Sequence, residues 1–295
     1  MDVEMKIQEA INKVTRKQKL KNYSKHPGSF LLALLTKLAI LLTVLALGFI
    51  LIYILVKGIP NLSTDLFALK YTTENVSMLP AIINTLTITL LSLCIAGPIG
   101  IFSAIYLVEY AKKGNKLVEV VRVTAETLTG IPSIVYGLFG MLFFVTTLKC
   151  GYSLLAGALT LSIMVLPVIM RTTEEALLAV PNSFREGSFG LGAGKLRTIF
   201  KIVLPSAVPG ILAGVILAIG RMVGETAALI YTAGTVAEIP SSIMSSGRTL
   251  AIHMYSLSKE GLYTDQAYAT AVVLLIVVVL INMLSNFVAK KFTKK

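Results

Sequence analysis

Charged residues are scarce in this 295-residue chain, and tryptophan is absent. Only 14% of the residues are charged, whereas a water-soluble domain carries about 25%. Hydrophobic residues make up 55% of the chain, and its mean hydropathy is +0.81. The deficit of charge argues against a large water-soluble core and predicts a protein of the lipid bilayer.

Cysteine and histidine are also rare, with two of each. Cys94 and Cys150 fall at different depths of the apolar runs described below, so we expect neither a disulfide nor a metal site from them. His26 and His253 are isolated, and we interpret them as surface or interfacial residues. The sequence contains no His-Glu-x-x-His motif and no histidine–aspartate pair within a run, so nothing in it favours a membrane hydrolase. We expect no cofactor and no metal.

Long apolar runs are abundant, and a membrane span needs about 20 apolar residues. The first run is too long, and begins too late, for a cleaved secretory signal, and no small-residue cleavage site follows it. We therefore predict an all-α, polytopic membrane protein with six helices. The runs are Phe30–Val56, Pro80–Leu107, Leu128–Leu148, Tyr152–Met170, Ser206–Ala233 and Ala267–Val288.

The net charge of +12 would suit nucleic acid, but its distribution points elsewhere. Lysine and arginine cluster before run 1, between runs 2 and 3, between runs 4 and 5, and after run 6. The alternate loops hold only Lys57, Lys70, Lys149, Arg248 and Lys259. With six spans, all the basic segments fall on one side of the membrane, as the positive-inside rule requires. We predict a multi-pass protein of the plasma membrane with both termini in the cytoplasm and no nucleic-acid partner.

We divide the chain into two parts. In residues 1–28, apolar residues at helical spacing alternate with lysines, which predicts a basic amphipathic helix on the inner leaflet; a docking surface for a partner is the alternative. Residues 29–291 form one membrane domain. The function of the external segment 235–266 stays open, although Leu250, Met254 and Leu257 predict a short interfacial helix there.

The stretch FGLGAGKLRT, Phe189 to Thr198, resembles a phosphate-binding loop at first sight. A Walker A loop has four residues between its two glycines, followed by lysine and a hydroxyl residue. Here Gly190 and Gly194 are separated by three residues, and Leu196 follows Lys195. The dinucleotide-binding pattern fails as well, because its third glycine is missing. We expect no nucleotide site in this chain.

The same region predicts a helix–turn–helix. Ser183 and Glu186 have the spacing of a capping box after Pro181. The glycines that follow permit a sharp turn. A second helix then carries an apolar stripe of Leu196, Ile199, Phe200 and Val203, and Pro205 is expected to interrupt it before run 5. A helix resting on lipid is the alternative to a docking element.

Run 5 contains two charges, Arg221 and Glu225, in an apolar setting where a charge costs about 2.5–3.5 kcal/mol or more. Four residues apart on a helix, they would lie within reach of each other and on one face with small residues that favour close helix packing. Those small residues are Gly210, Gly214 and Ala218. Two interpretations remain open, namely a salt bridge that locks two helices and an oxyanion site in which Glu225 positions Arg221.

Two further features concern the inner half of the membrane domain. Gly130 and Pro132, with Gly137 and Gly140, predict a kinked and closely packed run 3. Arg171, at the inner end of run 4, is either an anion contact or an ordinary anchor, and Glu126 is expected to be unpaired.

EGSFGLGAGKLRTIFKIVLP resembles the coupling loop of the permeases of binding-protein-dependent ABC importers. The residues in register with that pattern are Glu186, Gly192, Ile202, Leu204 and Pro205. Gly187 and Ser188 replace the usual alanines but remain small, and Ala193 follows the central glycine. The resemblance implies that a loop within residues 172–205 docks into a separate ATPase, which would explain the absent nucleotide motif.

RMVGETAALI, GIPSIVYGLFG and RTTEEALLAVPNSFREGSFGLGA resemble the PstA family of phosphate transport system permeases. The similarity covers about residues 75–290, with Ala228 standing where the family commonly has proline. It implies a type I importer core in membrane lipid, paired as a heterodimer with a second permease. It also implies two cytoplasmic ATP-binding subunits, an extracytoplasmic phosphate-binding protein, and inorganic phosphate as substrate. A permease for another oxyanion, such as sulfate or molybdate, is the alternative, and a passive channel would have little use for the coupling loop.

Overall fold

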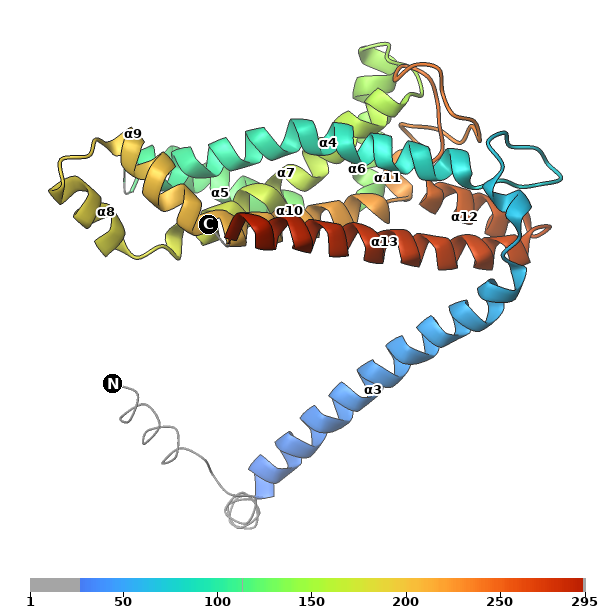
Figure 1. The fold of residues 1–295 in the computed structure, drawn as a ribbon, viewed down its shortest axis with the longest axis horizontal. Helices are drawn as coiled ribbons and strands as arrows, with labels where there is room; N and C mark the ends of the chain where they lie inside the picture. The colour runs from blue at the N-terminus through green and yellow to red at the C-terminus, as the bar shows by residue number, and fades with distance from the viewer. Residues whose placement is uncertain (1–26, 113, 294–295) are drawn as a thin grey trace. The chain divides into compact units, whose positions relative to one another are not determined.

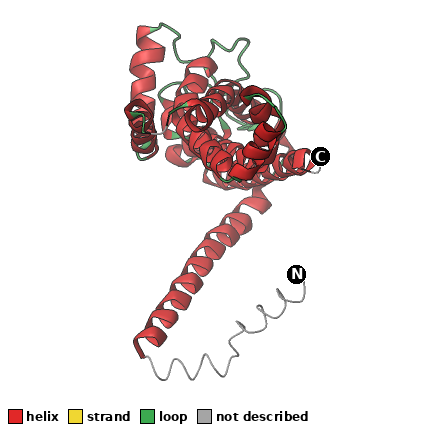
Figure 2. Ribbon diagram, turned by 90° about the vertical axis from the view of Figure 1, so that its left-hand side faces the viewer, coloured by secondary structure: helices red, strands yellow, loops and turns green. Residues whose placement is uncertain are grey.

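The computed structural model describes residues 27–112 and 114–293. The expected amphipathic helix in residues 1–28 therefore lies almost entirely outside the described residues. Within that part of the chain all regular structure is helical and no strand occurs (Figure 2). The chain divides into two compact units, residues 1–56 and residues 57–295.

The first unit contributes one long helix, α3 (Pro27–Gly58), which includes the first expected run. None of its residues up to Val56 is buried. A helix that is apolar on all sides and exposed on all sides is stable only in an apolar surrounding. The helix therefore has the character of a membrane span.

The second unit is built around four long helices that run side by side (Figure 1). They are α4 (Leu79–Ile105), which continues as the π-helical η3 (Tyr106–Tyr110), and α7 (Leu154–Leu178), α10 (Leu204–Val223) and α13 (Thr264–Thr293). α7 is the most buried of them, and its Leu161, Met164 and Ile169 are fully inaccessible. Runs 2, 4 and 6 are thus confirmed as helices, with α7 extending eight residues beyond the expected end at Met170.

Run 3 is not a single helix. α5 (Lys116–Thr129) is followed, after Gly130–Pro132, by α6 (Ser133–Gly140) and the π-helical η4 (Met141–Thr147), and the axis bends by 103° at the break. Within the described ranges, five helices are long and apolar enough to span a membrane, and this bent pair makes a sixth if it counts as one span. The expected kink is present, but it is far sharper than a kink within one helix.

Run 5 also ends earlier than expected. α10 stops at Val223, and the short α11 (Ala227–Ile230) begins after three residues. The prediction of one helix to Ala233 was wrong, because residues 224–226, the polar stretch Gly-Glu-Thr, are not helical.

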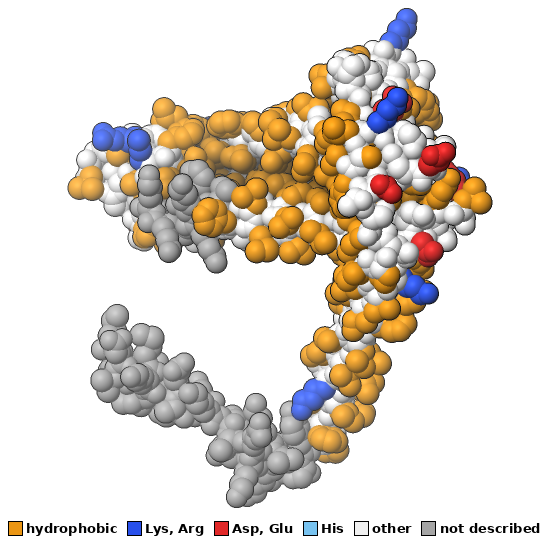
Figure 3. All heavy atoms as spheres, turned by 45° about the vertical axis from the view of Figure 1, so that its right-hand side comes forward, with side chains coloured by type: hydrophobic (Ala, Val, Ile, Leu, Met, Phe, Trp, Pro, Cys, Tyr) orange, Lys and Arg blue, Asp and Glu red, His pale blue; other side chains and the backbone are white. Residues whose placement is uncertain are grey.

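The two ends of the bundle differ. At one end lie α8 (Asn182–Gly190), α9 (Lys195–Thr198) and the π-helical η5 (Ile199–Val203), which runs without a break into α10. At the other end lie the short helices η1 (Ile59–Asn61) and η2 (Thr64–Phe67) and the expected helix α12 (Leu250–Glu260) (Figure 1). On the face that Figure 3 shows, apolar side chains cover the length of the bundle, and charged side chains gather at its ends. This surface is typical of a bundle surrounded by lipid.

Candidate functional site

Arg221 lies in the last turn of α10, where the free carbonyl groups of the helix end favour a cation. Its side chain is partly buried, and no carboxylate of the described residues lies within 4.0 Å of it. Tyr136 of α6 is near enough to interact with it electrostatically, and the Tyr136 hydroxyl donates a hydrogen bond to the Leu128 carbonyl at 2.7 Å. Arg221 is therefore a guanidinium with unused donors beside the break in run 3.

Glu225 does not pair with Arg221, contrary to the expected helical spacing. The helix ends between them, and the buried Glu225 carboxylate accepts a hydrogen bond from the Ala228 amide at 3.1 Å. A proline at position 228 would lack this amide. The alanine thus supplies the hydrogen bond that holds Glu225 at the start of α11.

The small residues of α10 face α7. A Cβ atom at Gly210 would lie 2.6 Å from the Ala176 Cβ, and one at Gly214 would overlap the Thr172 side chain. Ala218 is fully buried on the same side. The two helix backbones therefore approach more closely than larger residues would allow.

The small residues of run 3 divide into two groups. Gly130 and Pro132 lie at the exposed bend and are not packed. Gly137 and Gly140 are buried, and a Cβ at Gly137 would lie 2.8 Å from the Ala228 Cα. The close packing thus lies in α6, against the segment that follows Glu225.

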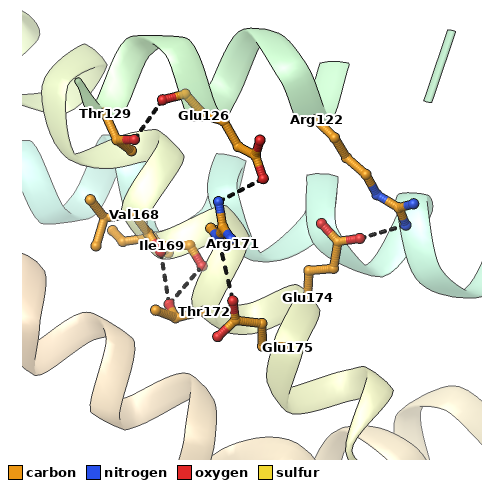
Figure 4. A network of polar contacts seen from close by, with 9 residues as sticks. All are labelled: Arg122, Glu126, Thr129, Val168, Ile169, Arg171, Thr172, Glu174 and Glu175. Atoms are coloured by element: carbon orange, nitrogen blue, oxygen red, sulfur yellow. Dashed lines mark hydrogen bonds and ion pairs between the residues drawn. The ribbon is translucent and has the colours of Figure 1, made fainter. Parts of the chain in front are cut away.

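Arg171 belongs to a network of ion pairs between α5 and α7 (Figure 4). Its guanidinium lies 2.7 Å from Glu126 and 3.2 Å from Glu175, while Arg122 lies 2.5 Å from Glu174. The expectation of an unpaired Glu126 was therefore wrong. These side chains line a cavity of 260 Å³, but its basic groups are all neutralised. The network joins α5 to α7, and the charge of Arg171 is balanced by two carboxylates.

α8 and α9 form the expected helix–turn–helix, but the first helix is not capped as predicted. The helix begins after Pro181 without a side-chain cap, so Ser183 and Glu186 do not form a capping box. Gly192 adopts a φ of +82°, the left-handed conformation that glycine accepts most readily. Ser188 and Thr198, one on each arm, share a hydrogen bond of 2.8 Å.

The residues expected to meet an ATPase are mostly accessible. Glu186, Gly187, Gly192, Ile202 and Pro205 are exposed, and Ser188, Ala193 and Leu204 are partly buried. Several apolar side chains beside them also face outward. These are Phe184, Phe189, Leu191 and Leu196.

The predicted apolar stripe of the second arm is confirmed for only two of its four residues. Ile199 and Val203 are buried against the C-terminal parts of α4 and α7, whereas Leu196 and Phe200 are exposed. The cause is the π-helical turn Ile199–Val203, which changes the angle between successive residues. The same turn carries the chain past Pro205 without breaking the helix, so the expected interruption there is absent.

Two polar clusters in the structure are not predicted from the sequence. The first is Arg185, paired with Glu109 at 2.7 Å. The second surrounds Arg248, which is 5% exposed, packs over the Tyr71 ring at 4.7 Å, and has two guanidinium nitrogens without a hydrogen-bond partner in the described chain. His253, expected at a surface, is fully buried beside Tyr71, and burial together with Arg248 lowers its pKa to about 3. Partners so distant in sequence leave no local pattern.

Both cysteines are free, as expected. No group of three or more histidine, cysteine, aspartate or glutamate side chains in the described ranges is arranged to hold a metal ion.

Comparisons with known proteins agree with this architecture. Residues 96–295 match the family described as "Binding-protein-dependent transport system inner membrane component". The chain is 36% identical to the phosphate transport system permease protein PstA of Pasteurella multocida, over 87% of this chain and 92% of that protein. It is 32% identical to the probable ABC transporter permease protein YqgI of Bacillus subtilis, over 82% of this chain and 88% of that protein.

Among solved structures, a chain of a bacterial ABC transporter involved in the import of the acidic polysaccharide alginate has a similar fold. The TM-score is 0.68 at 17% sequence identity, and the similarity covers 92% of this chain and 99% of that chain. The resemblance seen in the motifs is thereby confirmed. The chain belongs to the family of binding-protein-dependent transport system inner membrane components, the permeases of ABC importers, and is related within it to the PstA permeases.

Proposed function

We propose that this chain is a transmembrane permease subunit of an ATP-driven importer that moves inorganic phosphate into the cytoplasm. The observation that carries the proposal is Arg221, a partly buried guanidinium without a carboxylate partner in the described chain. A guanidinium presents a planar fork of donors that suits the oxygens of phosphate. The relatives named for phosphate transport support this choice of anion.

The backbone beside Arg221 supports a hydrated path. Residues 224–226 are not helical, and irregular backbone at membrane depth is tolerated where it is buried in protein or lines a water-filled cavity. Arg221 is one turn before this break, and Gly224 within it is exposed. On this proposal phosphate meets Arg221 as the pathway opens alternately to the two sides, and Glu225 shapes the path from its position at the start of α11. Arg171, held by two carboxylates, serves as an anchor.

The α8–α9 end is proposed to face the cytoplasm, with both termini, because the basic loops fall on that side. Its exposed apolar side chains Phe184, Phe189 and Leu191 suit docking to two ATP-binding subunits. A second permease would complete a heterodimer, and an extracytoplasmic phosphate-binding protein would approach the α12 end. The family description supports the dependence on a binding protein.

ATP hydrolysis is assigned to the partner subunits, since the glycine–lysine stretch folds as a helix–turn–helix. The purified chain should therefore hydrolyse no ATP. Hydrolysis by the chain alone, at rates above those of a mock preparation, would contradict this assignment.

The direct test is uptake of radiolabelled phosphate by the complete complex reconstituted in vesicles. We expect ATP-dependent uptake that unlabelled phosphate inhibits and that sulfate and molybdate, at equal concentration, do not. Inhibition by sulfate or molybdate as strong as that by phosphate would assign the permease to another oxyanion.

A further inference from the structure

The π-helical end of α4 contacts both arms of the helix–turn–helix. The π-helical η3 presents Glu109 and Tyr110 as successive residues. Glu109 pairs with Arg185 of α8, and the Tyr110 ring lies 4.8 Å from the Lys195 ammonium at the start of α9. Two consecutive residues of one turn thus hold elements more than 70 positions later in the sequence.

Of these two contacts, the one made by Arg185 includes more hydrogen bonds. Its Nη2 and Nε donate to the Glu109 carboxylate at 2.7 and 3.1 Å. The remaining donors reach the last carbonyl groups of α7 and of the residues just after it, Leu177 at 3.0 Å and Val180 at 2.8 Å. One guanidinium therefore joins α8 to the ends of both α4 and α7.

Burial distinguishes this ion pair from the others in the described chain. The side chains of Arg185 and Glu109 are 15% and 8% exposed, whereas those of Arg171 and Glu126 are 51% and 59% exposed. An exposed pair contributes little, because water and salt screen it. Removing one partner of a buried pair leaves a charge without compensation and is strongly unfavourable. The Arg185–Glu109 contact is thus a stiff connection, while the Arg171 network is easily rearranged.

We infer that Glu109 and Arg185 are positioning residues that transmit the movement of α8 to α4 and α7 during transport. The inference rests on the proposed function, in which the α8–α9 end docks to the ATP-binding subunits. On this inference their role requires no contact with the substrate. Because of the Arg185–Glu109 contact, a movement of α8 would move α4 and α7 together.

The test compares Glu109→Gln, Arg185→Gln and the double variant in the reconstituted importer. The quantities measured are phosphate transported per ATP hydrolysed and the yield of assembled complex. We expect each single variant to lower the transport-to-hydrolysis ratio at least tenfold with the yield unchanged. The double variant should be no worse than either single variant, because the two residues act as one contact. Glu119 is an exposed glutamate of α5 that has no ion pair with any described residue, so Glu119→Gln should leave the ratio unchanged.

Arg185→Lys keeps the charge but has three donors on a single nitrogen, so it cannot make all four of these hydrogen bonds. We expect it to lower the ratio by less than Arg185→Gln does. If an unpaired charge prevents a single variant from assembling, the inference is tested with Arg185→Lys and with the neutral double variant instead.

An unchanged ratio in the variants that assemble would overturn the inference. A double variant whose loss is the product of the two single losses would also overturn it, because the residues would then act independently. Failure of the proposed function is a separate result, since the wild-type complex itself would then show no ATP-dependent phosphate uptake.

Discussion

Arg221 and Glu225 lie four residues apart but on opposite sides of a helix end. Arg221 closes the last turn of α10, and Glu225 accepts the Ala228 amide at the start of α11. The arginine is therefore not neutralised by the glutamate nearest to it in sequence. This separation leaves the guanidinium available to an anion, which a salt bridge within one helix would not.

The packing of α10 on α7 predicts different effects for two glycines of the same helix. A Cβ at Gly214 would overlap Thr172, whereas one at Gly220 would meet no atom within 4 Å. Gly214→Ala should therefore destabilise the protein by about 1–3 kcal/mol through overpacking. Gly220→Ala should be neutral or stabilise by up to about 1 kcal/mol, because alanine favours a helix. Unfolding temperatures of the two variants in detergent provide the measurement, and equal shifts would contradict the close packing.

The turn between α8 and α9 predicts a backbone effect at Gly192. No neighbouring atom would meet a Cβ there, but its φ of +82° is unfavourable for other residues, most of all for β-branched ones. Gly192→Val should strain the turn by about 1–2 kcal/mol and lower phosphate transported per ATP hydrolysed. Gly192→Asn, which tolerates this conformation, should lose less, and Gly190→Ala, without a positive φ, should behave as wild type. If Gly192→Val transported as much phosphate per ATP hydrolysed as Gly190→Ala, the conformation of this turn would have no part in coupling.

His253 predicts a pH dependence of stability at the α12 end. Because its pKa in the folded protein is about 3, the unfolded chain binds a proton below pH 6.5 that the folded chain excludes. Stability should thus be complete above pH 6.5 and fall as the pH drops towards 3, by about 2 kcal/mol at pH 5. Unfolding temperatures of wild type and His253→Gln between pH 7 and 5 test this. We expect a flatter profile for the variant, and parallel profiles would refute the assignment.

The amino-acid sequence predicts best what depends on long apolar runs and charge. Runs 2, 4 and 6 became α4, α7 and α13 because nothing within them competes with a helix strongly enough to end it. Pro98 and Pro167 lie inside α4 and α7 without breaking them. The glycine turn at Gly192 was equally readable, since its conformation is a local property.

The sequence predicts less well where the outcome depends on distant partners. Gly224 follows the last residue of α10, whereas Gly214 and Gly220 lie within the same helix, and the residue type alone does not distinguish them. Gly130 and Pro132 predict a kink but not its angle of 103°, and the helical spacing of residues 196–203 does not predict the π-helical turn at Ile199. The Arg185–Glu109 contact spans 76 positions and has no spacing rule that would predict it.

Arg221→Gln tests the central claim most directly, in a complex reconstituted with its partners and compared with Lys259→Gln. Lys259 is an exposed lysine of α12, so its loss removes one positive charge elsewhere on the protein. The account predicts that Arg221→Gln reduces phosphate uptake to background at an unchanged yield of complex, while Lys259→Gln retains uptake. Wild-type uptake by Arg221→Gln would contradict it.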